Sequence, residues 1–213
     1  MCKPKIFIDL DGTILDVSER IYQIYKKILK RYGKKILSKK EYIKLKKEKT
    51  SNLEILSKTN AEEVLIEFEK EWLKNIEKKE FLKLDELSEE NRKFLLNTKK
   101  DFSFILVTLR RNTDNLLYEL KSKKISEIFD KVLVDDNGDT KENWKIKYDL
   151  IKSYGGYNNA IIVGDTKTEI MAGKKLGLKT VAITSGMTSK DVLEKYKPDY
   201  LIKNISEIRK WNF

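Results

Sequence analysis

The chain has 213 residues, of which 40% are hydrophobic and 37% are charged, and it carries a formal net charge of +11. A chain of this size can bury a sizeable core, as one large domain or as one domain with a smaller insertion. It contains no histidine. Triads with a histidine base and zinc sites with histidine ligands are therefore excluded, and acid–base chemistry has to use carboxylates, Lys, Tyr or Cys.

The first apolar run ends at Asp9, which makes it too short for the core of a signal peptide. No other stretch approaches membrane-spanning length. The single cysteine, Cys2, has no partner for an internal disulfide, which agrees with a reducing compartment. We therefore expect a soluble cytoplasmic protein with no membrane segment.

Short apolar runs without alternation recur along the chain and predict strands buried on both faces of a parallel sheet. These runs lie at 6–8, 104–107, 132–134, 161–163, 181–183 and 200–202. Segments with helical periodicity separate them, and two of these end at glycines, after 154 and after 176. The alternation predicts an α/β fold with a doubly wound, Rossmann-like parallel sheet.

The alternation is interrupted between about residues 16 and 97, where we expect helices and no strand. Ser18 is predicted to cap a helix that stops at Gly33, residues 60–63 resemble a capping box, and Ser88 is predicted to cap a helix that leads back into the sheet. We therefore expect a core domain formed by 1–15 and 98–213, with a helical domain over 16–97 inserted in it.

Positive charge is concentrated between residues 26 and 49, where twelve Lys or Arg face two Glu. Such a stretch could attract anionic substrates or nucleic acid, with Tyr25, Tyr32 and Tyr42 as stacking surfaces. We favour a solvated helix face, because Tyr25 and Tyr32 fall on the apolar side of the predicted helix.

Polar residues follow three of the predicted strands: Asp9, Thr108 and Asp165. Ligands of open α/β sheets bind at the carboxyl ends of the strands, so these residues can converge in space. Asp11 lies two residues after Asp9, and extended backbone would project both carboxylates to one side. Such a pair needs a cation, whose shell Asp165 could complete. Magnesium fits best, because its sites combine carboxylates with phosphate oxygens, to which Thr108 could donate a hydrogen bond.

A positive charge near the carboxylates is also expected. Lys141 stands where a loop enters a predicted helix, and Lys145, one turn later, is the alternative. The lysine would stabilise a negatively charged transition state and lower the pKa of Asp9, which keeps Asp9 a nucleophile. Gly12 would allow the backbone to approach a ligand closely, and Thr13 could contribute its hydroxyl.

These residues resemble the four motifs of the haloacid dehalogenase superfamily of phosphotransferases. The motifs correspond to Asp9–Thr13, to Thr108 with Leu109, to Lys141 and to Gly164–Glu169. The resemblance implies that Asp9 forms an aspartyl-phosphate, while Asp11 protonates the leaving oxygen and then activates water. It also implies that phosphate is bound by Gly12, Thr13, Thr108, Leu109 and Lys141, and that Mg²⁺ is held by the Asp9 side chain, the Asp11 main-chain carbonyl and Asp165.

The helical insertion over 16–97 is similar to the cap of the phosphoglycolate phosphatase and β-phosphoglucomutase branch of this superfamily. The fourth motif departs from the usual pattern, because Glu169 stands where a second aspartate is common. Glu169 could contact the metal directly, reach it through water, or orient Lys141.

The expected function is magnesium-dependent hydrolysis of a small phosphorylated metabolite. A sugar-phosphate mutase and a phosphonate hydrolase that forms an imine on a cap lysine are alternatives within the same fold. A basic nucleic-acid-binding module and a receiver-like signalling domain are alternatives of other classes. The receiver-like alternative does not account for the helical insertion or for Asp165.

Overall fold

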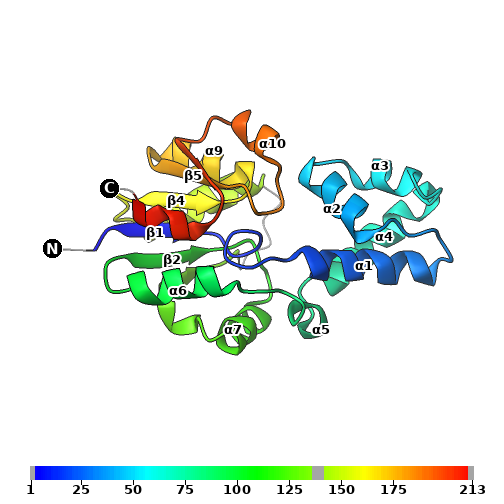
Figure 1. Ribbon diagram of the computed structural model, residues 1–213, viewed down its shortest axis with the longest axis horizontal. Coiled ribbons are helices and arrows are strands. Elements are labelled where there is room, and N and C mark those ends of the chain that lie inside the picture. Colours follow the sequence, from blue (N-terminus) through cyan, green and yellow to red (C-terminus); the bar gives the residue numbers. More distant parts are fainter. Residues whose placement is uncertain (1–2, 136–141, 211–213) are drawn as a thin grey trace. The chain divides into compact units, whose positions relative to one another are not determined.

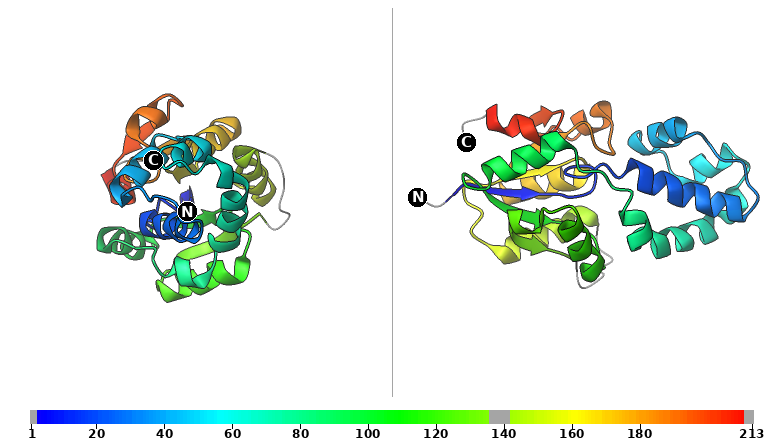
Figure 2. Two further views of the ribbon diagram at one scale, coloured as in Figure 1. Left: turned by 90° about the vertical axis from the view of Figure 1, so that its right-hand side faces the viewer. Right: turned by 60° about the horizontal axis from the view of Figure 1, so that its bottom comes forward.

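The computed structural model describes residues 3–135 and 142–210. The chain divides into two compact units, Met1–Asp16 with Leu87–Phe213 and Val17–Glu86 (Figures 1 and 2). Within the described ranges, no helix is long and apolar enough to cross a membrane.

The first unit contains a six-stranded parallel sheet in the order β3-β2-β1-β4-β5-β6 (Figure 1), which confirms the doubly wound α/β fold. Strand order reverses between β1 and β4, and a crevice for ligands forms at such a point, beyond the carboxyl ends of the strands. Asp9 directly follows β1 and Asp165 directly follows β4. The strands are β1 (Lys5–Ile8), β2 (Ser103–Val107), β3 (Phe129–Leu133), β4 (Ile161–Gly164), β5 (Lys179–Ile183) and β6 (Tyr200–Ile202).

Helices cover both faces of the sheet. Phe7 pairs in register with Ile105 and Ile162, and this row packs with Ile151 and Ala172 from two helices on one face. On the opposite face, Phe94 meets Phe104 edge to face, with ring centroids 6.2 Å apart. The helices of this unit are α6 (Glu89–Thr98), α7 (Thr113–Ser122), α8 (Asn143–Tyr154), α9 (Lys167–Leu176) and α10 (Lys190–Glu194).

The edge strand β3 differs from the expectation of burial on both faces. It begins at Phe129, and Asp130 and Lys131 are exposed. The run 132–134 therefore captured only the last two residues of this strand, Val132 and Leu133, which are half-buried. A strand with one neighbour can carry charged residues, which also protect a sheet edge from pairing with other chains.

The second unit is helical. Two capping boxes start helices here, at Ser38 with Glu41 and at Ser51 with Glu54. The expected box at 60–63 is wrong, since a 3-10 turn without a side-chain cap occupies Glu62–Val64. Ser18 is likewise not a cap but the first residue of its helix. The helices are α1 (Ser18–Arg31), α2 (Lys39–Lys47), α3 (Asn52–Ser57), α4 (Leu65–Asn75) and α5 (Lys79–Leu82).

The chain returns from the helical unit to the unit with the sheet after residue 86, whereas the sequence analysis expected this boundary after residue 97. Helix α6 accounts for this difference, because its buried residues Phe94 and Leu95 belong to the unit that contains the sheet. Ser88 caps α6 as predicted and accepts a hydrogen bond from the Asn91 backbone at 3.1 Å.

Two of the three tyrosines named for the basic stretch, Tyr25 and Tyr42, form part of a core, while Tyr32 is half-buried. The rings of Tyr25 and Tyr42 stack with centroids 4.2 Å apart, and both side chains are buried. They therefore do not offer the stacking surfaces that a nucleic-acid interface would use. Several lysines of this stretch form ion pairs within the same unit, such as Lys27 with Glu80 at 3.0 Å.

A buried ion pair lies near both ends of the helical unit. The Arg20 Nε lies 3.1 Å from the Asp85 Oδ1, and the two side chains are 2% and 0% exposed. Arg20 Nη1 also donates to the Ile76 carbonyl at 3.1 Å. The pair ties the first turn of α1 to the last residues of the unit, so its charges have to remain balanced.

Replacing Arg20 by Met should lower the free energy of unfolding by about 3–5 kcal/mol, because it removes the cation beside a fully buried carboxylate. The double change Arg20→Met with Asp85→Leu should restore most of this loss. Urea unfolding followed by circular dichroism measures both. Lys27→Met removes an exposed pair and should change stability by about 0.5 kcal/mol or less; equal losses for Arg20→Met and Lys27→Met would contradict this account.

Candidate active site

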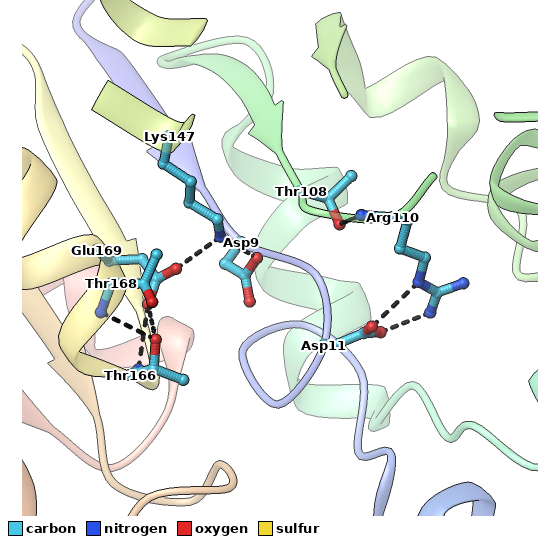
Figure 3. A network of polar contacts seen from close by, with 8 residues as sticks. All are labelled: Asp9, Asp11, Thr108, Arg110, Lys147, Thr166, Thr168 and Glu169. Carbon is cyan, nitrogen blue, oxygen red and sulfur yellow. Dashed lines mark hydrogen bonds and ion pairs between the residues drawn. The ribbon is translucent and has the colours of Figure 1, made fainter. Parts of the chain in front are cut away.

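Asp9 stands at the carboxyl edge of the sheet, immediately after β1. Its backbone N–H continues the ladder by donating to the Val163 carbonyl at 3.0 Å. The chain then turns tightly, since the Leu10 carbonyl accepts from the backbone N–H groups of Ile14 and Leu15, each at 3.0 Å. Gly12 permits this turn with a φ of +81°. Asp9 is buried, and its side chain points towards Lys147 (Figure 3).

Lys147 of α8 is the lysine that contacts Asp9. Its ammonium donates to the Asp9 Oδ1 and, at 2.6 Å, to the Glu169 Oε1 (Figure 3). Lys141 lies outside the described residues. The alternative Lys145 is instead half-exposed and pairs with Glu142 at 3.0 Å. Among the described residues, the lysine beside Asp9 is therefore Lys147, two residues beyond the alternative Lys145, while the role expected for Lys141 stays a prediction.

Glu169 holds Lys147 from the first turn of α9. Its Oε2 accepts from the Thr166 backbone N–H at 3.1 Å and from the Thr166 hydroxyl at 2.7 Å, which forms a capping box. Its Oε1 faces Lys147. Gly164 makes this position possible, because a Cβ there would lie 2.0 Å from the Glu169 Cγ. Of the three roles considered for Glu169, this geometry favours orientation of a lysine, although that lysine is Lys147.

The site contains more buried negative than positive charge. Burial raises the pKa of Asp9 to about 8; Lys147 opposes this shift, while Glu169 and Asp165 add to it. Burial lowers the pKa of Lys147, but Asp9 and Glu169 raise it, and the net shift is upward. Lys147 therefore stays charged. A further cation beside Asp9 would lower the pKa of Asp9 and keep it ionised.

Asp165 is enclosed by glycines beside this group. Its side chain is fully buried, and its Oδ2 accepts from the Met187 backbone N–H at 2.5 Å. A Cβ on Gly12 would lie 2.3 Å from the Asp165 Oδ2, and one on Gly186 would lie 2.3 Å from the Asp165 Cβ. The two glycines thus let main chain pack directly against the carboxylate.

This donor set fits magnesium. Among residues 3–135 and 142–210, no group of three or more Asp, Glu, His or Cys side chains is arranged to hold a metal. Magnesium does not need one, because it binds through one or two carboxylates and completes its shell with waters and substrate phosphate oxygens. Asp9 and Asp165 are the two carboxylates that could bind such an ion, and the Asp11 main chain lies in the same loop as Gly12.

Thr108 and Asp11 both contact Arg110 rather than Lys147. The Thr108 backbone N–H donates to the Leu133 carbonyl at 3.0 Å, and its hydroxyl oxygen accepts from the Arg110 N–H at 3.4 Å. The Asp11 carboxylate is bound by Arg110 rather than turned towards Asp9 (Figure 3). The expectation that both carboxylates face one reacting atom is therefore wrong for this conformation, because the tight turn after Asp9 ends the extended backbone.

The remaining predicted phosphate ligands lie on the same two loops. Thr13 is 3% exposed, and its Oγ1 has no hydrogen-bond partner among the described residues. Leu109 follows Thr108 and is half-buried. The loop after β1 therefore buries a hydroxyl close to Asp9 in sequence.

Sequence reasoning missed Lys147 and Arg110. The signal for Lys147 is its spacing, three residues after Trp144 and four before Ile151, which places a lysine on the buried face of α8. No comparable signal distinguishes Arg110 from the neighbouring Arg111. The structure makes Arg110 buried and Arg111 exposed.

Comparisons with known proteins bear on this geometry. A family model described as haloacid dehalogenase-like hydrolase matches residues 6–183. Pyrophosphatase PpaX of Bacillus cereus is 30% identical over 106 residues, which are 49% of this chain and 48% of that protein. PpaX of Bacillus velezensis is 31% identical over 106 residues, with the same coverage. The chain thus spans about half the length of the curated relatives it matches.

Solved structures share the fold over nearly the whole chain. A haloacid dehalogenase-like family hydrolase from Streptococcus pneumoniae has a TM-score of 0.76 at 21% identity, covering 98% of this chain and 97% of that one. A predicted phosphoglycolate phosphatase from Haemophilus somnus has a TM-score of 0.75 at 19% identity, with the same coverage of both chains. At these identities, the similarity establishes the fold.

Lys147→Met should lower the free energy of unfolding by about 3–5 kcal/mol, because Asp9 and Glu169 lose the buried cation they share. Lys145→Met, two residues earlier in the same helix, removes an exposed pair and should cost about 0.5 kcal/mol or less. Urea unfolding in the absence of divalent ions gives both values. The assignment of Lys147 is contradicted if the Lys145 variant is the less stable of the two.

Proposed function

Since the chain belongs to the haloacid dehalogenase-like hydrolase family, we propose that it is a magnesium-dependent phosphatase acting on a small phosphate monoester. The observation that carries the proposal is the Asp9 carboxylate, which is buried where the strand order reverses between β1 and β4 and is bound by Lys147. A carboxylate in such a position can serve as a nucleophile towards phosphorus. The relatives named as pyrophosphatases support phosphoryl chemistry.

In the first step, the Asp9 Oδ2 attacks phosphorus, because Oδ1 accepts from Lys147. The Oδ2–P bond forms and the P–O bond of the ester breaks. Asp11, which takes up a proton from solvent on leaving Arg110, gives that proton to the leaving oxygen. The Thr108 hydroxyl donates to a phosphoryl oxygen, while its oxygen accepts from the Arg110 backbone N–H. Lys147 stabilises the negative charge of the transition state.

In the second step, water hydrolyses the aspartyl-phosphate. Asp11 accepts a proton from the attacking water, the new P–O bond forms, and the bond between phosphorus and the Asp9 Oδ2 breaks. Asp9 returns as a carboxylate held by Lys147, and inorganic phosphate leaves. Asp11 releases its proton to solvent and returns to Arg110. The alternative acceptor is a second sugar hydroxyl, which would make the chain a mutase.

Asp9, Asp165 and the Asp11 main-chain carbonyl would hold the magnesium ion. When bound, the ion supplies positive charge that offsets the substrate phosphate and the buried carboxylates. We assign Glu169 to Lys147 rather than to the metal, because both of its oxygens already accept hydrogen bonds from Lys147 and Thr166.

The helical unit Val17–Glu86 is proposed to act as a cap that selects the substrate. It is inserted directly after the loop that carries Asp9 and Asp11. In this position, it can differ between related enzymes without altering the sheet that carries the chemistry. The small phosphorylated metabolite it selects is best identified by a substrate screen.

Asp9→Asn should reduce phosphate release from an aryl phosphate with magnesium by about 10³-fold or more, because an amide is not a nucleophile towards phosphorus. Asp191→Asn, at an exposed position of α10, should leave the rate unchanged. Chelation of divalent ions should abolish the wild-type rate, and magnesium should restore it. An Asp9→Asn variant with full turnover would falsify the mechanism. Release of inorganic phosphate, rather than transfer to a sugar, distinguishes the phosphatase from the mutase.

Gly186→Ala should weaken magnesium binding by about 10- to 100-fold, since the added Cβ would press on the carboxylate of Asp165 and the carbonyl of Gly12. The magnesium dependence of the rate and calorimetric titration both report this affinity. Ser189→Ala in the same loop is the control, because Ser189 makes no side-chain cap hydrogen bond to α10. Unaltered magnesium affinity in the Gly186 variant would remove Asp165 from the proposed metal site.

A further inference from the structure

Arg110 links two carboxylates on the Asp11 side of the site. Its Nε donates to the Asp11 Oδ2 at 3.1 Å and its Nη2 to the Asp11 Oδ1 at 2.5 Å, which makes the contact bidentate. Its Nη1 donates to the Glu119 Oε2 at 2.5 Å. The planar guanidinium therefore binds both acids at once, a geometry that a lysine cannot reproduce.

The two ends of this network differ in burial. The Arg110 and Glu119 side chains are 3% and 1% exposed, whereas the Asp11 side chain is 32% exposed. Separating Arg110 from Glu119 would leave two charges in a buried environment. Water can solvate Asp11 if it leaves Arg110, so the Asp11 end is the one that can open.

The orientation of Asp11 matters because of what the proposed reaction requires. Asp9 points to Lys147 and Asp11 points to Arg110, so the two carboxylates diverge (Figure 3). An arriving phosphate carries negative charge, and a second carboxylate turned towards it would repel it. Protonation of the leaving oxygen, however, requires Asp11 to leave Arg110, to take up a proton from solvent, and to come within hydrogen-bond reach of that oxygen.

We propose that Arg110, fixed by Glu119, is a positioning residue that holds Asp11 away from Asp9 in the substrate-free enzyme and releases it once phosphate is bound. This inference rests on the proposed function, in which Asp11 acts on the leaving oxygen. Arg110 does not touch the reacting atoms. It sets how often Asp11 occupies its working orientation, and substrate binding shifts that population.

Kinetics with two esters test the proposal. The double variant Arg110→Met with Glu119→Met removes both buried charges together, so that neither is left uncompensated. An aryl phosphate with an acidic leaving group needs little protonation, whereas an alkyl phosphate depends on it. The ratio of kcat for the alkyl ester to kcat for the aryl ester should rise about threefold or more in the variant, because Asp11 no longer has to leave Arg110.

Two further variants calibrate this ratio. Arg110→Lys keeps a cation beside Glu119 but loses the bidentate contact, and should give an intermediate ratio. Arg92→Met is the control, since Arg92 binds the Lys123 carbonyl and Glu89 instead of Asp11, and it should give the wild-type ratio. A purely structural role for Arg110 would lower both rates equally and leave the ratio unchanged, which would overturn the proposal. A fall in the ratio would also overturn it, because Arg110 would then hold Asp11 in its working orientation.

Crystal structures test the same inference without turnover. Asp11 should lie on Arg110 in the free protein and should leave it in a complex with magnesium and a beryllium fluoride mimic of the aspartyl-phosphate. Asp11 on Arg110 in both structures, or in neither, would overturn the proposal. If the wild-type chain hydrolyses neither ester, the proposed function fails, and this pair of structures still decides whether Arg110 releases Asp11.

Discussion

The buried ammonium of Lys147 is the interaction on which the site depends. It joins three separate elements, since Lys147 comes from α8, Asp9 follows β1 and Glu169 opens α9. Each carboxylate would be costly to bury by itself, and one shared cation compensates both. Glu169 has two roles, because it forms the capping box with Thr166 at the start of α9 and also orients Lys147. The start of α9 and the position of Asp9, the proposed nucleophile, are therefore coupled.

Lys147 does not balance the site completely. Asp165 is a third buried carboxylate, and glycines at 12 and 186 bring main chain so close to it that no side chain fits between them. The packing thus concentrates negative charge and backbone oxygen at the point where strand order reverses. A hard divalent cation is the partner that such a group of oxygens favours. The excess of buried negative charge is therefore the physical reason for proposing a magnesium ion at this site.

The sheet could be predicted well from sequence, because uninterrupted apolar runs report burial on both faces and because the residues after them lie at one edge. This reasoning placed Asp9, Thr108 and Asp165 beside the carboxyl ends of β1, β2 and β4. It did not find Lys147, since a lysine-rich helix offers several candidates and only the angular position around α8 separates them. It also missed the orientation of Asp11, which depends on the turn made by Gly12 and on a distant arginine. The start of α1 was also misplaced by one residue. Ser18 was expected to cap this helix, but it is the first helical residue, and Val17 occupies the cap position.

Asp9 and Asp11 form equivalent contacts in different surroundings. Each carboxylate binds a buried cation, but the Asp9 side chain is 11% exposed and that of Asp11 is 32% exposed. A nucleophile benefits from a fixed position, because attack requires alignment with the reacting atom. A group that donates a proton in one step and accepts one in the next has to serve two different oxygens. The deeper burial of Asp9 and the greater exposure of Asp11 give each carboxylate the mobility that its proposed role requires.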